Sequence, residues 1–299
     1  MIFKKEYKLG IALGGGSAKG LAHIGVLKVL NEEGIKIHSI SGTSIGSIVG
    51  GIYALKPEIE NLLSESKRLI NSNAFKELRF DKFSRNEGGW FGRIKSRFRD
   101  GLTIADALMK KSLIPEETFE KIFKEIFDDY DVRDAIIPFS CIAVDLISGE
   151  DIIFDKGPLY KLAMASSSIP GVFPPVKYKD YILVDGGVTS NVPIEGARKL
   201  GAEKVIGVVV SGNLKGQGNF SKAIEVILRS DEIAKFKLFR TTLKEADFLL
   251  EIDLSEFHWA DFSRIDELIS RGEEATRKEL KNIKELLKGK TLWERILKK

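Results

Sequence analysis

A serine between two glycines is the residue in this sequence best suited to chemistry. Ser44 stands in the segment Gly42-Thr43-Ser44-Ile45-Gly46, which lies between an apolar stretch and a run with helical spacing. A G-x-S-x-G sequence between a strand and a helix is typical of a nucleophile elbow, because side chains at the flanking positions would collide. The helix that follows would direct its N-terminal amides at a developing oxyanion. Ser44 is therefore a candidate nucleophile for acyl transfer, and the alternative is an ordinary helix N-cap.

A second glycine-rich loop precedes the serine, with the sequence Gly14-Gly15-Gly16-Ser17-Ala18-Lys19-Gly20. A phosphate-binding loop of the Walker type needs Lys and Ser or Thr after the last glycine, whereas Leu21 follows here. A dinucleotide fingerprint needs glycines at different spacings and an acidic residue at the end of the next strand. Nucleotide binding is therefore excluded. The remaining interpretations are an oxyanion hole built from bare amides, or a turn that only connects.

The base that would activate Ser44 is less obvious. The chain has three histidines. His258 alone follows the order Ser, acid, His along the chain, but its surroundings are typical of a surface turn, and His23 and His38 are typical of helix-face or surface positions. Asp185 ends a short apolar strand and precedes Gly186-Gly187, so it could reach a neighbouring strand end directly. A free Asp has a pKa of about 3.9 and would need desolvation to act as a base. The alternative is that Asp185 merely begins a turn.

The elements that would position these residues begin with a βαβ unit. Residues 7–13 and 35–40 are predicted strands, and residues 18–33 and 47–55 are predicted helices. Both glycine-rich turns then lie at the carboxyl ends of parallel strands, where open α/β sheets bind their ligands. Further strands are predicted at 136–145, 151–154, 181–184, 204–211 and 248–252, and further helices at 159–167, 194–200, 221–246 and 265–287.

Residues 58–130 differ from the rest because they are charged and helical in pattern, and they predict a helical cap inserted beside the sheet. Within this region, residues 93–99 are basic, with Ile94 and Phe98 between the charges. Such a stretch could touch a membrane surface, and the alternative is a solvated helix.

The composition sets outer limits. The 299 residues are 43% hydrophobic, which suits a large folded domain. The net charge of +4 is too weak to indicate nucleic-acid binding. The one cysteine, Cys141, lies in an apolar run and is predicted to be buried, without a disulfide or metal cluster. No signal peptide or membrane span is recognised, so a cytoplasmic location, with peripheral membrane contact, is expected. A single glutamine among many Lys and Glu residues is typical of a thermophile.

Taken together, these motifs resemble the patatin-like phospholipase family. The glycine-rich loop, the elbow and Asp185-Gly186-Gly187 occur in the family's order. The segment from Ala165-Ser166 to Phe173-Pro174-Pro175 resembles the family's A-S-x-x-x-P-x-x-F-P-P, and residues 145–150 resemble its D-L-x-T-G-E. The likeness spans residues 7–210. It departs from the family at Ser17, which replaces a frequent fourth glycine, while Lys19 stands where Arg or Lys is usual.

The resemblance implies a three-layer α/β/α fold with a mainly parallel sheet. It implies a Ser44–Asp185 dyad without a catalytic histidine, and an oxyanion hole formed by the amides of Gly15, Gly16 and Ser17. Gly14, Lys19, Gly20, Gly42, Gly46, Gly186 and Gly187 would support these motifs. The expected activity is hydrolysis of acyl lipids or esters without cofactor or metal; the alternative is a regulatory or protein-interaction module with little turnover. Residues 211–299 lie outside the resemblance, and their pattern predicts a mainly helical extension packed on the same domain.

Overall fold

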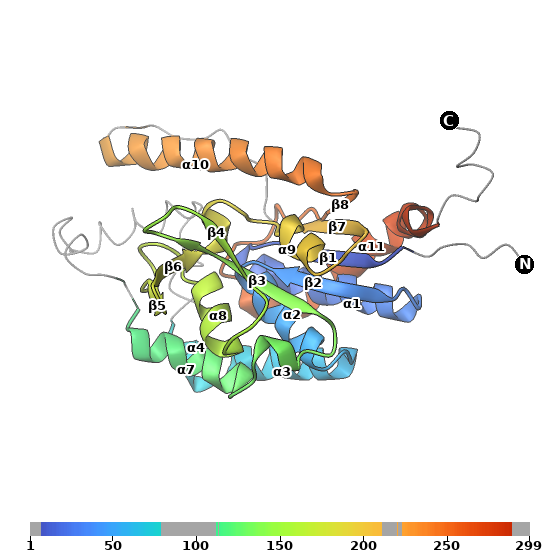
Figure 1. Cartoon of the computed structure of the whole chain (residues 1–299), viewed down its shortest axis with the longest axis horizontal. Helices are drawn as coiled ribbons and strands as arrows, with labels where there is room; N and C mark the ends of the chain where they lie inside the picture. The colour runs from blue at the N-terminus through green and yellow to red at the C-terminus, as the bar shows by residue number, and fades with distance from the viewer. Residues whose placement is uncertain (1–6, 79–111, 113, 211–219, 221–222, 289–299) are drawn as a thin grey trace, which may run out of the picture.

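The computed structural model describes residues 7–78, 112, 114–210, 220 and 223–288. In this part of the chain eight strands form one sheet that lies between helices (Figure 1). The strands are β1 (Leu9–Leu13), β2 (Ile37–Gly42), β3 (Phe139–Asp145), β4 (Asp151–Phe154), β5 (Val176–Tyr178), β6 (Tyr181–Asp185), β7 (Lys204–Val209) and β8 (Phe248–Glu251).

The sheet has two halves of different direction. Its order is β5-β6-β3-β2-β1-β7-β8, and β4 also pairs with β3. The strands from β3 through β2, β1 and β7 to β8 pair in parallel, whereas β4 and β6 run antiparallel to β3, and β5 antiparallel to β6. Leu13 of β1 pairs with Gly42 of β2 and with Val208 of β7, so these three strands end side by side. The mainly parallel α/β sheet predicted from the sequence is confirmed.

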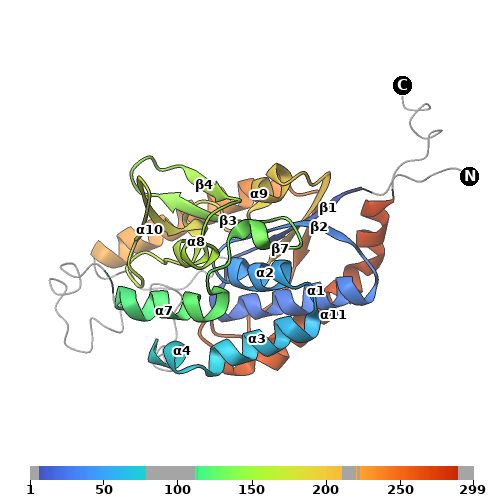
Figure 2. The ribbon, with the colours of Figure 1, turned by 60° about the horizontal axis from the view of Figure 1, so that its bottom comes forward.

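Helices cover both faces of the sheet and give it three layers (Figure 2). One face carries α1, α2, α3, α7, α8 and α11, and the other carries α9 and α10. The bounds are α1 (Ala22–Glu32), α2 (Ile45–Leu55), α3 (Ile59–Asn71), α4 (Asn73–Glu77), α7 (Glu116–Phe127), α8 (Leu159–Ser166), α9 (Ile194–Lys199), α10 (Ala223–Thr242) and α11 (Ile265–Leu287). The helix predicted from residue 18 begins instead with a 3₁₀ turn, η1 (Ser17–Leu21).

The described part of the predicted insertion contributes to the main core. Leu62 of α3 and both Phe123 and Phe127 of α7 are buried in the same apolar cluster as β1 and β2. These helices are strongly amphipathic in sequence, and their apolar faces explain why they join the helical layer. Residues 79–111 lie outside the described residues, and with them the basic stretch 93–99.

Cys141 lies on β3, whose residues are all buried, as the sequence predicted. Burial raises the pKa of its thiol to about 12, so the thiol stays protonated and unreactive at neutral pH. Among the helices that the structure describes, none combines the length and the apolar character needed to cross a bilayer.

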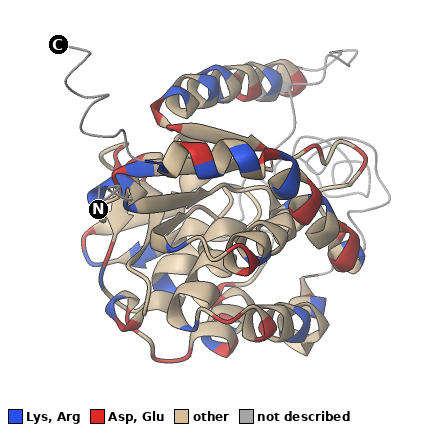
Figure 3. Ribbon diagram, turned by 90° about the vertical axis from the view of Figure 1, so that its right-hand side faces the viewer, with Lys and Arg blue, Asp and Glu red and all other residues tan. Residues whose placement is uncertain are grey.

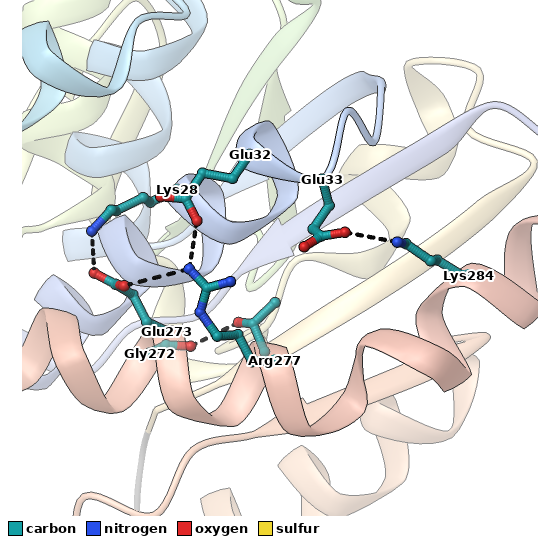
Figure 4. Close-up of polar contacts among 8 residues, drawn as sticks. Lys28, Glu32, Glu33, Gly272, Glu273, Arg277 and Lys284 are labelled. Carbon is teal, nitrogen blue, oxygen red and sulfur yellow. Dashed lines mark hydrogen bonds and ion pairs between the residues drawn. The ribbon is translucent and has the colours of Figure 1, made fainter.

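The C-terminal helix α11 packs against α1 at unusually close range (Figure 4). A side chain at Gly25 would collide with the backbone of α11, and one at Gly272 would collide with the carbonyl of Ala22, so both positions need glycine. Three ion pairs flank this contact, between Lys28 and Glu273, Arg277 and Glu32, and Lys284 and Glu33. Helix α11 is therefore closely fitted to the helix that follows the glycine-rich loop.

Candidate active site

Ser44 forms a sharp turn between β2 and α2. Its backbone has φ 55° and ψ −124°, a conformation that non-glycine residues rarely adopt. A side chain at Gly42 would collide with the carbonyl of Gly46, and one at Gly46 would collide with the carbonyl of Leu13. The two flanking glycines are therefore required by close backbone contacts, which is the geometry of a nucleophile elbow.

Hydrogen bonds from three directions hold the strained turn. The Ser44 amide donates to Oγ of Ser166 at the end of α8, at 3.1 Å. The Thr43 hydroxyl donates to the carbonyl of Ser190 at 2.9 Å, and the Ser47 hydroxyl donates to the carbonyl of Ser44 at 2.6 Å. The role of Ser166 was not predicted, although its segment was noted in the sequence as part of the resemblance.

Asp185 lies at the end of β6, where it meets the elbow. Its carboxylate accepts a hydrogen bond from the Gly187 amide at 2.7 Å, and the Ser44 hydroxyl lies close enough to act on its pKa. The side chain is buried. Burial raises the pKa of this carboxyl to about 6, although the Gly187 amide, the Ser44 hydroxyl and the positive charge of Lys235 each act to lower it. The structure thus brings together the two residues that the sequence singled out, and it supplies the desolvation that a carboxylate base needs.

The glycine-rich loop lies against the elbow. A side chain added at Gly15 would stand 3.3 Å from Cβ of Ser44. The amide of Gly14 donates to the carbonyl of Val208 at 3.2 Å, and that of Gly15 donates to the carbonyl of Asn191 at 3.0 Å. The predicted donor Gly15 is therefore engaged within the protein, and Asn191 was not foreseen because nothing in its local pattern marks it.

The end of the loop is anchored by neighbouring elements. Ser17 opens η1 with a positive φ of 54°, and the next amide, that of Ala18, donates to the carbonyl of Trp259 at 2.9 Å. Gly20 packs against Ile45 of α2 so closely that a side chain there would collide with it. Hydrogen bonds from Ser255 lower the pKa of Asp253, and the positive charges of Arg271 and Lys19 add to this effect, so Lys19 lies near Asp253.

The histidines have other surroundings. His23 is fully buried in α1, and its Nε2 lies 2.7 Å from the Gly14 carbonyl. Burial lowers the pKa of His23 to about 4, so the ring is neutral at pH 7 and its Nε2 proton is donated to that carbonyl. Nδ1 of His258 accepts from the Ala260 amide, and His38 is half-buried on β2. The Ser44 hydroxyl instead acts on the pKa of the Asp185 carboxyl.

Several known proteins resemble this chain. A patatin-like phospholipase domain-containing protein of Caenorhabditis elegans is 32% identical over 227 residues, 74% of this chain and 15% of that protein. A lysophospholipase of Debaryomyces hansenii is 30% identical over 202 residues, 68% of this chain and 12% of that protein. The crystal structure of VipD from Legionella pneumophila aligns with a TM-score of 0.48 and 14% identity, over 93% of this chain and 67% of that one.

This chain thus spans less than a sixth of the length of the two curated relatives. The family model described as "Patatin-like phospholipase" matches residues 11–198, which include the end of β1, the glycine-rich loop, the elbow and Asp185. Because this match covers well over half of the 299 residues, the chain belongs to the patatin-like phospholipase family.

Proposed function

We propose that the protein is a serine hydrolase of lipid acyl esters that uses Ser44 as nucleophile and Asp185 as base. The observation that carries the proposal is the meeting of the elbow serine with the buried carboxylate of Asp185. Burial raises the pKa of this carboxyl to about 6, and the Ser44 hydroxyl lies close enough to act on that pKa. A carboxylate with this pKa is mostly ionised at pH 7 and still accepts a proton more readily than an ordinary Asp. The elbow holds Ser44 in a strained but well-supported conformation.

The first half of the reaction transfers the acyl group to the enzyme. Oγ of Ser44 attacks the ester carbonyl carbon while its proton passes to Asp185, which gives a tetrahedral intermediate with a negative oxygen. Collapse of this intermediate breaks the bond to the alcohol, and Asp185 returns the proton to the leaving oxygen. The products of this step are the free alcohol and an ester of Ser44.

The second half releases the acid. A water molecule gives a proton to Asp185 and attacks the Ser44 ester, and collapse of the second intermediate returns the proton to Oγ. The carboxylic acid then leaves and the free enzyme is regenerated. One carboxylate thus serves as base and acid in both halves, which its near-neutral pKa permits.

We assign the oxyanion to the amides at the start of η1. The amide of Gly15 already donates to Asn191 and that of Ala18 to Trp259, which leaves Gly16 and Ser17 between them as the donors of choice. Gly15 has a different task in this scheme, because its lack of a side chain lets the loop approach Cβ of Ser44. Backbone donors that are fixed before the reaction stabilise the transition state without reorganisation.

The substrate class follows from the family. Acyl lipids such as phospholipids or lysophospholipids are proposed because the family and the relative from Debaryomyces hansenii carry these substrates in their names. Residues 7–210 would supply the catalytic machinery, and α11 would hold the helix behind the oxyanion loop.

The test combines a fluorophosphonate probe with p-nitrophenyl ester hydrolysis. Wild type should be labelled and active, Ser44→Ala should lose labelling, and Asp185→Ala should lose at least about a thousandfold in rate. His258→Ala should keep labelling and turnover. Labelling that persists in Ser44→Ala would disprove the nucleophile. A wild type that neither reacts nor hydrolyses would instead favour a regulatory or protein-interaction module.

A further inference from the structure

Helix α10 presents apolar side chains to solvent along its outer side. Figures 1 and 3 show α10 as the outermost element on its face of the molecule. Ile227 is 62% exposed, Val226 50%, Leu238 43% and Ile233 36%, and Phe220, just before the helix, is 48% exposed. These are five of the large apolar residues that the described part of the chain leaves open to water, gathered on one short segment.

The spacing of these residues places them on one side of the helix. Steps of seven and four residues keep side chains on one side of a helix. Val226, Ile233 and Lys237 follow these steps, and Ile227, Ala234 and Leu238 follow them one position later. The opposite side faces the protein, where Phe239 packs against the second apolar cluster. These exposed apolar side chains therefore lie on the outer side of α10, where the described part of the chain leaves them open to water.

The charges of α10 favour an anionic partner. Asp231 pairs with Lys235 at 2.7 Å and Glu232 pairs with Arg229 at 2.6 Å, so these acids are neutralised within the helix. The charged residue within the apolar stripe itself is a cation, Lys237, which is exposed. Arg240, beside it, pairs with Glu251 of β8 at 3.3 Å. A cation within an exposed apolar helical face is typical of helices that lie in the interface of an anionic bilayer.

The helix also lies near the catalytic centre. Its residue Lys235 is close enough for its charge to act on Asp185. Strand β7, which precedes α10 along the chain, ends beside the glycine-rich loop, because the Gly14 amide donates to the carbonyl of Val208. A surface that seats α10 would therefore be close to the site at which an acyl chain is cleaved.

The size of the face argues for a membrane and against a second protein. A helix of 20 residues is about 30 Å long, and a face about 10 Å wide covers about 300 Å². A stable protein interface buries about 800 Å² on each partner, so pairing of two such helices would be too small. Shallow insertion into a bilayer needs only a few apolar side chains and a cationic rim.

We propose that α10 is a lipid-docking helix, which lays the side defined by Val226, Ile227, Ile233 and Leu238 on an anionic bilayer. This inference deepens the proposed function, because it specifies how a hydrolase of membrane lipids would be held at its substrate. Docking requires no turnover, so it can be measured in Ser44→Ala, and the two proposals can fail separately.

The experiment is flotation of the Ser44→Ala protein with vesicles of phosphatidylcholine and phosphatidylglycerol at three to one. Adding Ile227→Ser and Leu238→Ser should weaken binding about tenfold or more, since two apolar anchors are lost. Lys237→Gln should weaken it about fivefold, with no such effect on vesicles of phosphatidylcholine alone. The matched control is Ile136→Ser, because Ile136 is 69% exposed and lies away from the site. It precedes the start of β3, whereas Asp185 pairs with Ala143 near the end of that strand. The Ile136→Ser protein should bind like its parent.

Three results would overturn the proposal. The first is a parent protein that does not float with the anionic vesicles, and the second is equal flotation of the parent and the Ile227→Ser, Leu238→Ser variant. The third is light scattering that shows a dimer which these substitutions convert to a monomer, since the apolar face would then belong to a second copy. In protein that keeps Ser44, the same substitutions should leave the hydrolysis of a soluble p-nitrophenyl ester unchanged. This assay separates membrane docking from catalysis.

Discussion

The ionisation of Asp185 should govern the pH dependence of the enzyme. Burial raises the pKa of this carboxyl to about 6, and only its ionised form can accept the Ser44 proton. The value of kcat/KM, which reports the free enzyme, should therefore rise with pH through about 6 and then level off. An exposed Asp would produce its rise about two pH units lower.

The size of the effect follows from the fraction ionised. With a pKa of about 6, the carboxyl is about 90% ionised at pH 7 and about 9% ionised at pH 5, so kcat/KM should fall about tenfold between them. With the ordinary pKa of about 3.9, more than about 90% would remain ionised at pH 5 and the rate would hardly change. The two cases differ enough for routine kinetics.

Lys235 provides a way to move this midpoint. Its positive charge lowers the pKa of Asp185, so Lys235→Gln should shift the rise of kcat/KM toward higher pH. Lys237→Gln removes the same charge from the same helix, but at an exposed position on its outer side, and should leave the midpoint in place. The assay is p-nitrophenyl ester hydrolysis from pH 4 to 9, with product measured after adjustment to one pH.

Two outcomes would refute this reasoning. A kcat/KM that is constant between pH 5 and 7 would show that Asp185 either keeps an ordinary pKa or is not the base. A shift toward lower pH in Lys235→Gln, or an equal shift in Lys237→Gln, would show that the charge of Lys235 does not act on Asp185 as the structure indicates. The dyad has one further requirement, which is that Asp185→Ala loses activity at every pH tested.

Two further predictions concern stability. Because the folded pKa of Asp185 is above the ordinary value of 3.8, its ionisation costs folding free energy as pH rises from about 4 to 6. Asp185→Asn should therefore raise the free energy of unfolding at pH 7 by up to about 3 kcal/mol, measured with urea. Equal or lower stability of the variant would contradict this. His23 has the opposite sign, since its folded pKa of about 4 is below 6.5 and its stabilising effect is lost as pH falls from about 6.5 to 4. His23→Gln keeps a donor for the Gly14 carbonyl without titrating, so wild type should lose about 3 kcal/mol more than this variant between pH 7 and 4.

The first half of the fold could be predicted because local pattern and tertiary structure agree there. Residues with period-two or helical spacing correspond to β1, α1, β2 and α2 to within a few residues. The helix at 265–287 was predicted with its observed bounds. The start of α1 was missed because the chain there follows the backbone geometry of the loop, with Ser17 at a positive φ, and not its helical propensity. The short strand β5 was not predicted, since its few residues follow two prolines and pair with β6 as a strand.

The candidate site was predictable wherever glycine marks a close contact. Gly42 and Gly46 cannot carry side chains beside the Leu13 and Gly46 carbonyls, and that constraint is visible as a pattern in the chain. Ser166 and Asn191 leave no such trace. Their contributions depend on a hydroxyl and a carbonyl that the fold brings from distant positions, and many other residues could offer the same atoms. Pattern therefore identifies the reacting groups better than the groups that orient them.

The contact between α1 and α11 sets the size of the unit that must be kept together in protein engineering. Every motif residue lies before residue 199, where the family match ends, yet Gly25 of α1 fits against a backbone some 240 residues further along the chain. A fragment cut near residue 210 would retain the nucleophile, the base and the loop, and would expose the apolar side of the helix that carries His23 to water. A gene fusion that transfers this activity to another protein should therefore include the whole segment from β1 to the end of α11. This segment is longer than the one that the family motifs span.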